Sequence, residues 1–133
     1  MKVLPEEVQR HIAAATICRV ASVLPDGTAH VAPVCPVSVE GTLYIDVSHV
    51  GGTARALAAG SSVTALFDEY HDEWDRLKGV LLYCRAAEVT GAERDRVWRV
   101  LREKYPQSVD AKWNPRLTLA LRVEDWKQWG VVP

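Results

Sequence analysis

The chain has 133 residues, a formal net charge of −1 and a sequence pI near 6.4. This length favours a single domain spanning residues 1–133, whose folding buries about two-thirds of the unfolded chain's surface. The near-neutral charge, without a run of lysine or arginine, argues against nucleic-acid binding, and no apolar stretch approaches the roughly 20 residues that cross a bilayer, so we expect a cytoplasmic protein.

Hydrophobic periodicity predicts an N-terminal helix followed by six strands. Pro5 opens the helix, in which Val8 and Ile12 recur with helical spacing. "PDGT" at 25–28 predicts a hairpin between the first two strands, "EG" at 40–41 predicts one between the second and third, and a meander follows. The strands are the β-branched and apolar segments 16–24, 28–39, 42–48, 62–70, 79–90 and 116–123.

A second helix, at 90–105, separates the last two strands. Thr90 and Glu93 have the spacing of a capping box at its start. Short, even strands with one interrupting helix predict a mainly β (α+β) fold, a six-stranded antiparallel barrel with flanking helices. Trp126 and Trp129 are at helical spacing and are expected to pack on the barrel or on a partner subunit rather than to stack on a ligand, whereas Trp74 is a candidate substrate lid.

Two features of the early strands bear on binding. Pro33 and Pro36 lack the amide hydrogen that a regular central strand needs, which indicates either an ordinary edge strand or an edge that offers backbone groups to a planar ligand. Arg19 lies among apolar neighbours and predicts a partner, either a carboxylate or a ligand phosphate, unless its head reaches water at the rim. Arg85 raises the same question with less force, because Glu88 is close by.

Other reactive residue types give no defined site. Cys18, Cys35 and Cys84 are odd in number and lie in apolar runs, which is typical of buried thiols rather than metal ligands. The acidic segment 68–76 surrounds a histidine without a fixed ligand spacing, so we expect a solvated loop and no metal. His30 and His49 have no visible triad partner, and no catalytic residue is assigned.

The stretch "HVGGTARAL", residues 49–57, follows a strand and opens a short helix. Thr53 is placed to cap that helix to about residue 59, and Gly51 and Gly52 allow a close approach of the backbone to a ligand. With Arg55 one turn in, the segment is either an anion site or a plain turn.

These residues resemble a known family. The segment "ICRVASVLPDGTAHVAPVCPVSVEGTLYIDVSH" contains a strand, an Asp-Gly hairpin, a PHxxPV-like strand and an LYxxT-like strand in that order. It is similar to the opening of the pyridoxamine 5′-phosphate oxidase-like, FMN-binding split-barrel family. The later "DEYHDEWDRL", "REKYPQ" and "DWKQWG" resemble its branch of deazaflavin F-420-dependent enzymes, so the resemblance covers nearly the whole chain.

The resemblance implies a six-stranded split barrel that forms a homodimer and binds FMN or deazaflavin F-420 at the subunit interface. The implied activity is that of an oxidoreductase, which passes a hydride to or from a small organic substrate. By position, Pro33, Val34, Cys35 and Pro36 match the strand beside the ring, Ser48, His49, Gly52, Thr53 and Arg55 match the phosphate segment, and Arg19 matches a supporting position on the first strand.

The chain departs from the family at Gly52, where relatives commonly have a basic residue, and at Arg85, where many have glycine. A missing charge-assisted contact costs about 1.5–3 kcal/mol, or roughly one to two orders of magnitude in affinity. Because of this departure, and because no acid-base pair is identifiable, the second hypothesis is a non-catalytic protein that stores or senses a flavin or haem. A structural dimer without ligand is the third hypothesis.

Overall fold

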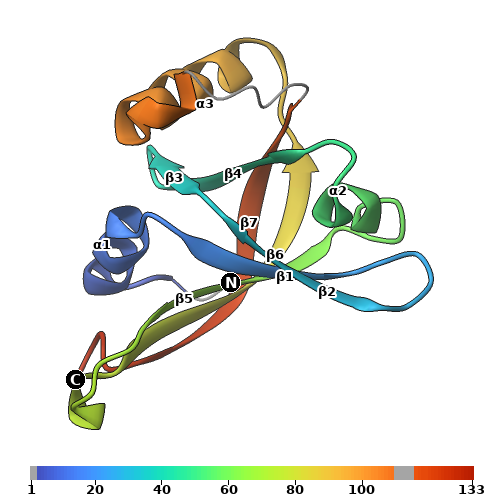
Figure 1. The fold of residues 1–133 in the computed structure, drawn as a ribbon. Helices are drawn as coiled ribbons and strands as arrows, with labels where there is room; N and C mark the ends of the chain where they lie inside the picture. The colour runs from blue at the N-terminus through green and yellow to red at the C-terminus, as the bar shows by residue number, and fades with distance from the viewer. Residues whose placement is uncertain (1–2, 110–115) are drawn as a thin grey trace.

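The computed structural model describes residues 3–109 and 116–133 as one curved antiparallel sheet with helices against it (Figure 1). Two 3-10 turns also occur, at Trp74–Arg76 and Pro106–Val109. Within residues 3–109 and 116–133, no helix is long and apolar enough to cross a membrane. The elements are α1 (Glu6–Ala14), β1 (Cys18–Val23), β2 (Ala29–Val34), β3 (Pro36–Val39), β4 (Thr42–Ser48), α2 (Gly52–Ala56), β5 (Ser62–Glu69), β6 (Lys78–Glu88), α3 (Gly91–Lys104) and β7 (Arg116–Trp129).

The strand order shows how the sheet curls. It is β2-β1-β5-β6-β7-β4-β3, and each neighbouring pair is antiparallel. β2 and β3 follow one another in the chain but lie at opposite edges of this order, so the edges must come together. Figure 1 shows β2 passing close to β4, and residues of these two strands are in contact. The sheet is therefore a half-barrel. Consecutive strands pair in β1–β2, β3–β4, β5–β6 and β6–β7, but β1 pairs with β5 and β4 with β7, so the predicted meander does not hold throughout.

The prediction of six strands is wrong, because the segment 28–39 forms two strands rather than one. β2 pairs with β1 as far as Val34, and β3 pairs with β4 from Pro36 onward. Pro33 and Pro36 cannot donate ladder hydrogen bonds, so the chain changes its pairing partner across Cys35. The described residues thus contain seven strands.

Both predicted hairpins form, and each has a local reason. The amide of Thr28 donates to Asp26 Oδ1 at 2.9 Å, and Gly27 adopts a φ of +90°. Glu40 and Gly41 have φ values of 51° and 81°, as a tight two-residue turn between right-twisted strands requires.

The helices α1 and α3 begin where the sequence predicts, but the side-chain cap predicted for α3 does not form. α1 follows Pro5 and buries Val8 and Ile12. Thr90 is the N-cap residue of α3, yet its side chain makes no cap hydrogen bond. Glu93 accepts a 2.7 Å hydrogen bond from the hydroxyl of Tyr44 instead. The predicted capping box is therefore wrong, because a tertiary donor takes the carboxylate.

The C-terminal segment is a strand and not a helix. Trp126 and Trp129 lie in β7, where they pair with Leu82 and Gly79 of β6. A Cβ on Gly79 would overlap the Trp129 ring, so the glycine leaves room for that ring. The predicted helical spacing is overridden by pairing with β6.

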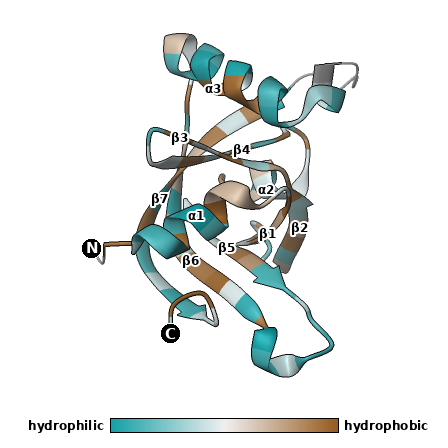
Figure 2. Cartoon of the chain, turned by 90° about the vertical axis from the view of Figure 1, so that its left-hand side faces the viewer, coloured by the Kyte–Doolittle hydropathy of each residue, from teal (hydrophilic) through white to brown (hydrophobic). Residues whose placement is uncertain are grey.

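Alternation along the strands places the main hydrophobic core inside the curl. Phe67, Ile45, Leu82 and Leu119 are among its fully buried side chains. In Figure 2 the strands carry most of the hydrophobic colour, whereas α1 and α3 alternate hydrophobic and hydrophilic residues. A second cluster joins α3 to β3 and β4 through Val97, Leu101, Tyr105, Val37, Val39 and Tyr44.

Lys104 ties α1, β3 and α3 together. Its ammonium donates to the carbonyl oxygens of Ala13, Ala15 and Pro36 at 3.2, 2.6 and 2.9 Å. Burial lowers the pKa of Lys104 below its ordinary value. The three acceptors include two carbonyls at the C-terminal end of α1, which would otherwise lack partners.

Candidate functional site

A cavity of about 380 Å³ lies between β2, the end of β4 and the start of α2. We call it the α2 cavity. Its position follows from the fold, because the curl brings β2 toward β4 and α2 packs against both strands. It is lined by His30, Ala32, Pro33, Val34, Cys35, Asp46, Val47, Ser48, Gly51, Gly52, Thr53 and Arg116.

Six of the ten predicted binding residues line this cavity. They come from three separate segments: Pro33, Val34 and Cys35 from β2 and its end, Ser48 from β4, and Gly52 and Thr53 from α2. The other four, Arg19, Pro36, His49 and Arg55, are not among the lining residues.

Arg19 has a protein partner. Its guanidinium donates to Asp68 Oδ1 at 2.8 Å, and both side chains are partly exposed. Alternation in β1 places Arg19 on the exposed face, away from Cys18 and Val20. Of the two partners that the sequence allowed, the structure shows the carboxylate.

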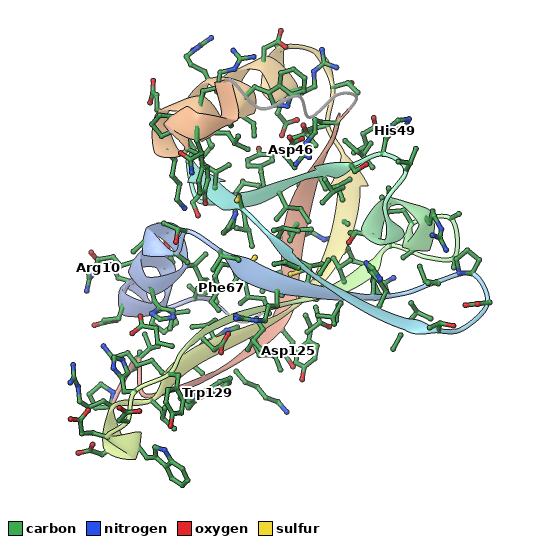
Figure 3. The ribbon with its side chains drawn as sticks, in the orientation of Figure 1. Arg10, Asp46, His49, Phe67, Asp125 and Trp129 are labelled. Atoms are coloured by element: carbon green, nitrogen blue, oxygen red, sulfur yellow. The ribbon has the colours of Figure 1, made fainter. Side chains whose placement is uncertain are left out.

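Pro36, His49 and Arg55 fail to reach the cavity for different reasons. Pro36 is buried, and its carbonyl oxygen accepts hydrogen bonds from Lys104 and Tyr105. His49 is exposed beyond the end of β4 (Figure 3), and Arg55 is exposed on α2. The phosphate-like segment therefore contributes only part of its predicted groups to the cavity.

Thr53 does not cap α2. The N-cap residue is Gly51, no side-chain cap hydrogen bond forms, and the helix ends at Ala56 rather than near residue 59. Thr53 is instead inside the helix and buried at the cavity wall. The prediction of a Thr53 cap is wrong, because the N-cap is Gly51 and the helix starts two residues earlier than a Thr53 cap would require.

Asp46 and Arg116 form a polar wall that the sequence did not reveal. Arg116 Nε donates to Asp46 Oδ2 at 2.8 Å, and Arg116 Nη2 donates to the backbone oxygen of Asp46 at 2.7 Å. Thr118 donates its hydroxyl to Asp46 Oδ1 at 3.0 Å and accepts from Trp98 Nε1 at 2.7 Å. A lone carboxylate inside the apolar run "LYIDVS" was the available signal, but its partner is 70 residues away.

His30 also lines the cavity, although sequence reasoning did not include it among the site residues. A Cβ placed on Gly52 would overlap the His30 imidazole, so this ring lies directly over the glycine. The signal was present in the PHxxPV-like strand, where His30 alternates with the exposed Val31. Only the packing of β2 on α2 brings it to the glycine.

The thiols divide into two kinds. Cys18 and Cys84 are buried and Cys35 is half-buried in the cavity wall. Burial raises the pKa of Cys18 to about 12, with smaller contributions from neighbouring charges. Burial, and then the charge of Glu124, raises the pKa of Cys84 to about 12. The prediction of buried thiols is confirmed for Cys18 and Cys84 but not for Cys35.

The acidic segment lies at the tip of the β5–β6 hairpin, far from the α2 cavity (Figure 1). Trp74 is exposed there and does not line this cavity. Arg85 pairs with Glu124 at 3.1 Å rather than with Glu88. Across residues 3–109 and 116–133, no group of three His, Cys, Asp or Glu side chains is arranged to hold a metal ion.

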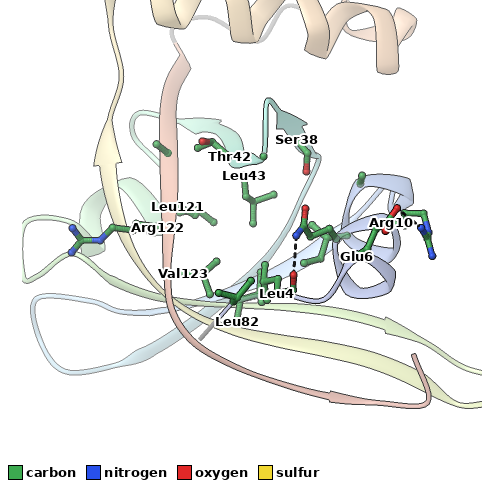
Figure 4. A pocket seen from close by; sticks show the side chains of 16 residues that line it. Leu4, Glu6, Arg10, Ser38, Thr42, Leu43, Leu82, Leu121, Arg122 and Val123 are labelled. Carbon is green, nitrogen blue, oxygen red and sulfur yellow. Dashed lines mark hydrogen bonds and ion pairs between the residues drawn. The ribbon is translucent and has the colours of Figure 1, made fainter. Parts of the chain in front are cut away.

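A larger space of about 640 Å³ lies between α1 and β7, and we call it the α1 pocket (Figure 4). Leu43, Leu82 and Leu121 line it, and Figure 4 shows them facing the space beside α1. Its charged groups lie at the rim, where Arg10 and Glu6 pair at 2.8 Å. No predicted site residue lines it.

Sequence comparison assigns the family. The model of the family described as "Pyridoxamine 5′-phosphate oxidase" matches residues 4–130. The chain belongs to this family. No match was found among the curated proteins.

Solved structures of the same fold bear varied descriptions. A conserved hypothetical protein, Rv2991 from Mycobacterium tuberculosis, shares 21% identity at a TM-score of 0.83, over 98% of this chain and 87% of its own. HutZ, the heme storage protein from Vibrio cholerae, shares 16% identity at a TM-score of 0.79, over 96% of this chain and 94% of its own. An FAD-binding protein from Mesorhizobium loti shares 19% identity at a TM-score of 0.74, over 95% of this chain and 92% of its own. At these identities the likeness shows the fold alone.

Proposed function

We propose that the chain is a flavin- or deazaflavin-dependent oxidoreductase that binds FMN or deazaflavin F-420 in the α2 cavity. The observation that carries the proposal is the convergence of β2, β4 and α2 on one space, with six residues matched to the family's cofactor segments on its wall. The match of the family model to residues 4–130 also supports it.

The lining of the cavity suits a ligand with an apolar, flat end and a polar end. Its volume of about 380 Å³ falls within the roughly 300–1,000 Å³ of small-molecule sites. Pro33, Val34 and Cys35 provide an apolar wall where the chain leaves the β1 ladder, and Ser48 and Thr53 provide hydroxyl groups near Gly52. A flat ring beside the first group and a phosphate beside the second would match both walls.

The chain's own residues bind and orient in this proposal. A bound flavin or deazaflavin supplies hydride transfer to or from a small organic substrate. Both carboxylate oxygens of Asp46 already accept hydrogen bonds from Arg116 and Thr118, so this side chain holds the wall rather than moving a proton. We assign no residue to acid-base catalysis.

A homodimer is part of the proposal, and exposed valines support it. Val23 and Val31 are 55% and 65% exposed on the outer face of the β1–β2 hairpin. An apolar patch of this kind often marks a protein interface. Analytical ultracentrifugation of the wild type and of a Val31→Asp variant tests it: we expect a dimer that the charge weakens, and a monomeric wild type would contradict this part of the proposal.

The cofactor is tested by the visible spectrum of the purified protein and by mass spectrometry of whatever heat releases from it. Titration with FMN and with F-420 then measures affinity, and turnover is assayed with a panel of electron donors and acceptors. We expect saturable binding of one cofactor and its reduction and reoxidation on the protein. A colourless protein that binds neither cofactor would overturn the proposal.

A non-catalytic protein that stores or senses haem or flavin is the second candidate. His30 and Cys35 favour it, because both line the α2 cavity and both residue types ligate haem iron. Haem titration, followed by its absorption band in wild type, His30→Ala and Cys35→Ala, tests it. Tight haem binding that either variant abolishes, with no turnover of bound flavin, would replace the first proposal by this one.

A further inference from the structure

The α2 cavity contains two kinds of charged or chargeable group. Asp46 and Arg116 form an ion pair at 2.8 Å, and the hydroxyl of Thr118 donates a hydrogen bond to the other carboxylate oxygen of Asp46. His30 differs, since among residues 3–109 and 116–133 its ring makes no hydrogen bond or ion pair. A half-buried imidazole with free nitrogens is thus available to a ligand in this cavity.

Gly52 determines where that imidazole lies. The Cβ of any other residue at 52 would overlap all three of the nearest His30 ring atoms, Cε1, Nε2 and Nδ1. Gly52 has no positive φ, so its backbone does not itself demand glycine. The space over Gly52 is what the glycine provides, and the His30 ring fills it beside Ser48 and Thr53.

We propose that His30 donates a hydrogen bond to the anionic phosphate end of the ligand, and that Gly52 is required to hold His30 there. The proposal rests on the proposed function, which places a phosphate-bearing cofactor in this cavity. Imidazole N–H donates to phosphate oxygen, and a hydrogen bond to a charged group is worth about 1.5–3 kcal/mol. The chain thereby obtains its contact with the anion from β2 rather than from a side chain at position 52.

The charged groups around His30 are compatible with this role. On β4 and β7, Asp46 and Arg116 are paired with each other. On α2, Arg55 is exposed, and on β1 Arg19 is held by Asp68 on the exposed face. Among the residues described, no carboxylate pairs with the His30 ring and competes with an anion for it.

The test uses two ligands with the same ring, FMN and riboflavin, because they differ only in the phosphate. Fluorescence titration measures both affinities for the wild type and for His30→Ala. We expect His30→Ala to lower FMN affinity about 10- to 100-fold and to leave riboflavin affinity unchanged. His71→Ala, the same substitution at the tip of the β5–β6 hairpin, is the control and should change neither affinity. F-420 and its phosphate-free ring core replace the pair if the protein prefers the deazaflavin.

Gly52→Ala supplies the second arm, since its methyl group would displace the His30 ring. We expect it to weaken FMN about as much as His30→Ala does, and the double variant to be no weaker than either single one. Gly60→Ala is the matched control, because a Cβ there meets nothing within 4 Å. Circular dichroism of each variant confirms folding before titration.

The outcomes separate the two proposals. If the wild type binds none of FMN, riboflavin, F-420 and the ring core of F-420, the proposed function and this inference are both overturned. If FMN and riboflavin bind the wild type equally, or His30→Ala weakens both equally, the inference alone is overturned. Additive losses in the double variant would likewise overturn the dependence of His30 on Gly52.

Discussion

The α2 cavity and the α1 pocket share one hydrophobic core but place charge differently. Val34 and Val47 of that core line the first, whereas Leu43, Leu82 and Leu121 line the second. The α1 pocket is the larger of the two, yet its charged side chains pair at the exposed rim. The α2 cavity is smaller and has a nearly buried ion pair and a free imidazole in its wall. Size alone would therefore favour the α1 pocket, whereas the placement of polar groups favours the α2 cavity.

The largest expected contrast concerns the two ion pairs. The Arg116 and Asp46 side chains are 19% and 10% exposed, against 64% and 81% for Arg10 and Glu6. Removing one partner of a nearly buried pair costs about 3 kcal/mol, whereas an exposed pair within one helix contributes about 0.3–0.5 kcal/mol. We expect Asp46→Ala to lower the free energy of unfolding by about 3 kcal/mol and Glu6→Ala by less than about 0.5 kcal/mol. Urea denaturation measures both, and equal losses would contradict the contrast.

Filling each cavity in turn tests which one binds the cofactor. Ala32 lines the α2 cavity and Ala13 lines the α1 pocket. We expect Ala32→Trp to weaken cofactor binding about 100-fold, or about 2.7 kcal/mol, because the indole occupies the ligand's space. Ala13→Trp serves as the matched control and should leave affinity unchanged. If the two effects are reversed, the ligand site is the α1 pocket.

The buried thiols of the main hydrophobic core should make the stability of the protein sensitive to alkali. The pKa of Cys18 and of Cys84 rises from 9.0 to about 12 on folding, so above pH 9 the unfolded chain loses these protons first. Each thiol then contributes stability that is fully present below pH 9 and is lost between pH 9 and 12, at about 1.4 kcal/mol per pH unit. Thermal melts from pH 8 to 11 should show this fall, with a shallower slope in Cys84→Ala. A melting temperature independent of pH in this range would disprove it.

The smallest expected effect is a difference in thiol reactivity. Cys35 is half-buried in the wall of the α2 cavity, whereas Cys18 and Cys84 are buried in the core. We expect iodoacetamide to label Cys35 several-fold faster than the other two in the native protein, and bound cofactor to slow that labelling. Peptide mass spectrometry locates the label. Protection of Cys18 or Cys84 instead would place the ligand elsewhere.

Local pattern was sufficient for most of the fold. Alternating apolar residues located part of every strand, although 28–39 forms two strands and the last strand extends to Trp129 instead of ending at 123. The turns at Asp26-Gly27 and Glu40-Gly41 formed as predicted. The failures occurred where a distant partner overrode a local preference. Glu93 accepts from Tyr44 rather than from the start of its own helix, and Trp126 pairs with Leu82 in a strand.

For the candidate site, the sequence by itself indicated segments that the structure brings to the wall of the α2 cavity. Pro33, Cys35, Ser48 and Thr53 lie on the cavity wall, where the family's order of motifs placed them. Each motif is a short stretch of the chain, and the turn or strand that it specifies is determined by a few neighbouring residues.

Only the tertiary structure decided which side chains face one another across the cavity. The curl of the sheet sets Arg116 against Asp46, 70 residues apart, and seats His30 over Gly52. It also turns Arg19 to Asp68 and leaves Arg55 and His49 exposed. Contacts of this kind depend on how the strands pair and twist, which no short window of sequence encodes. The absence of a side chain at position 52 therefore acquires a physical meaning only in the fold, as the space that His30 occupies.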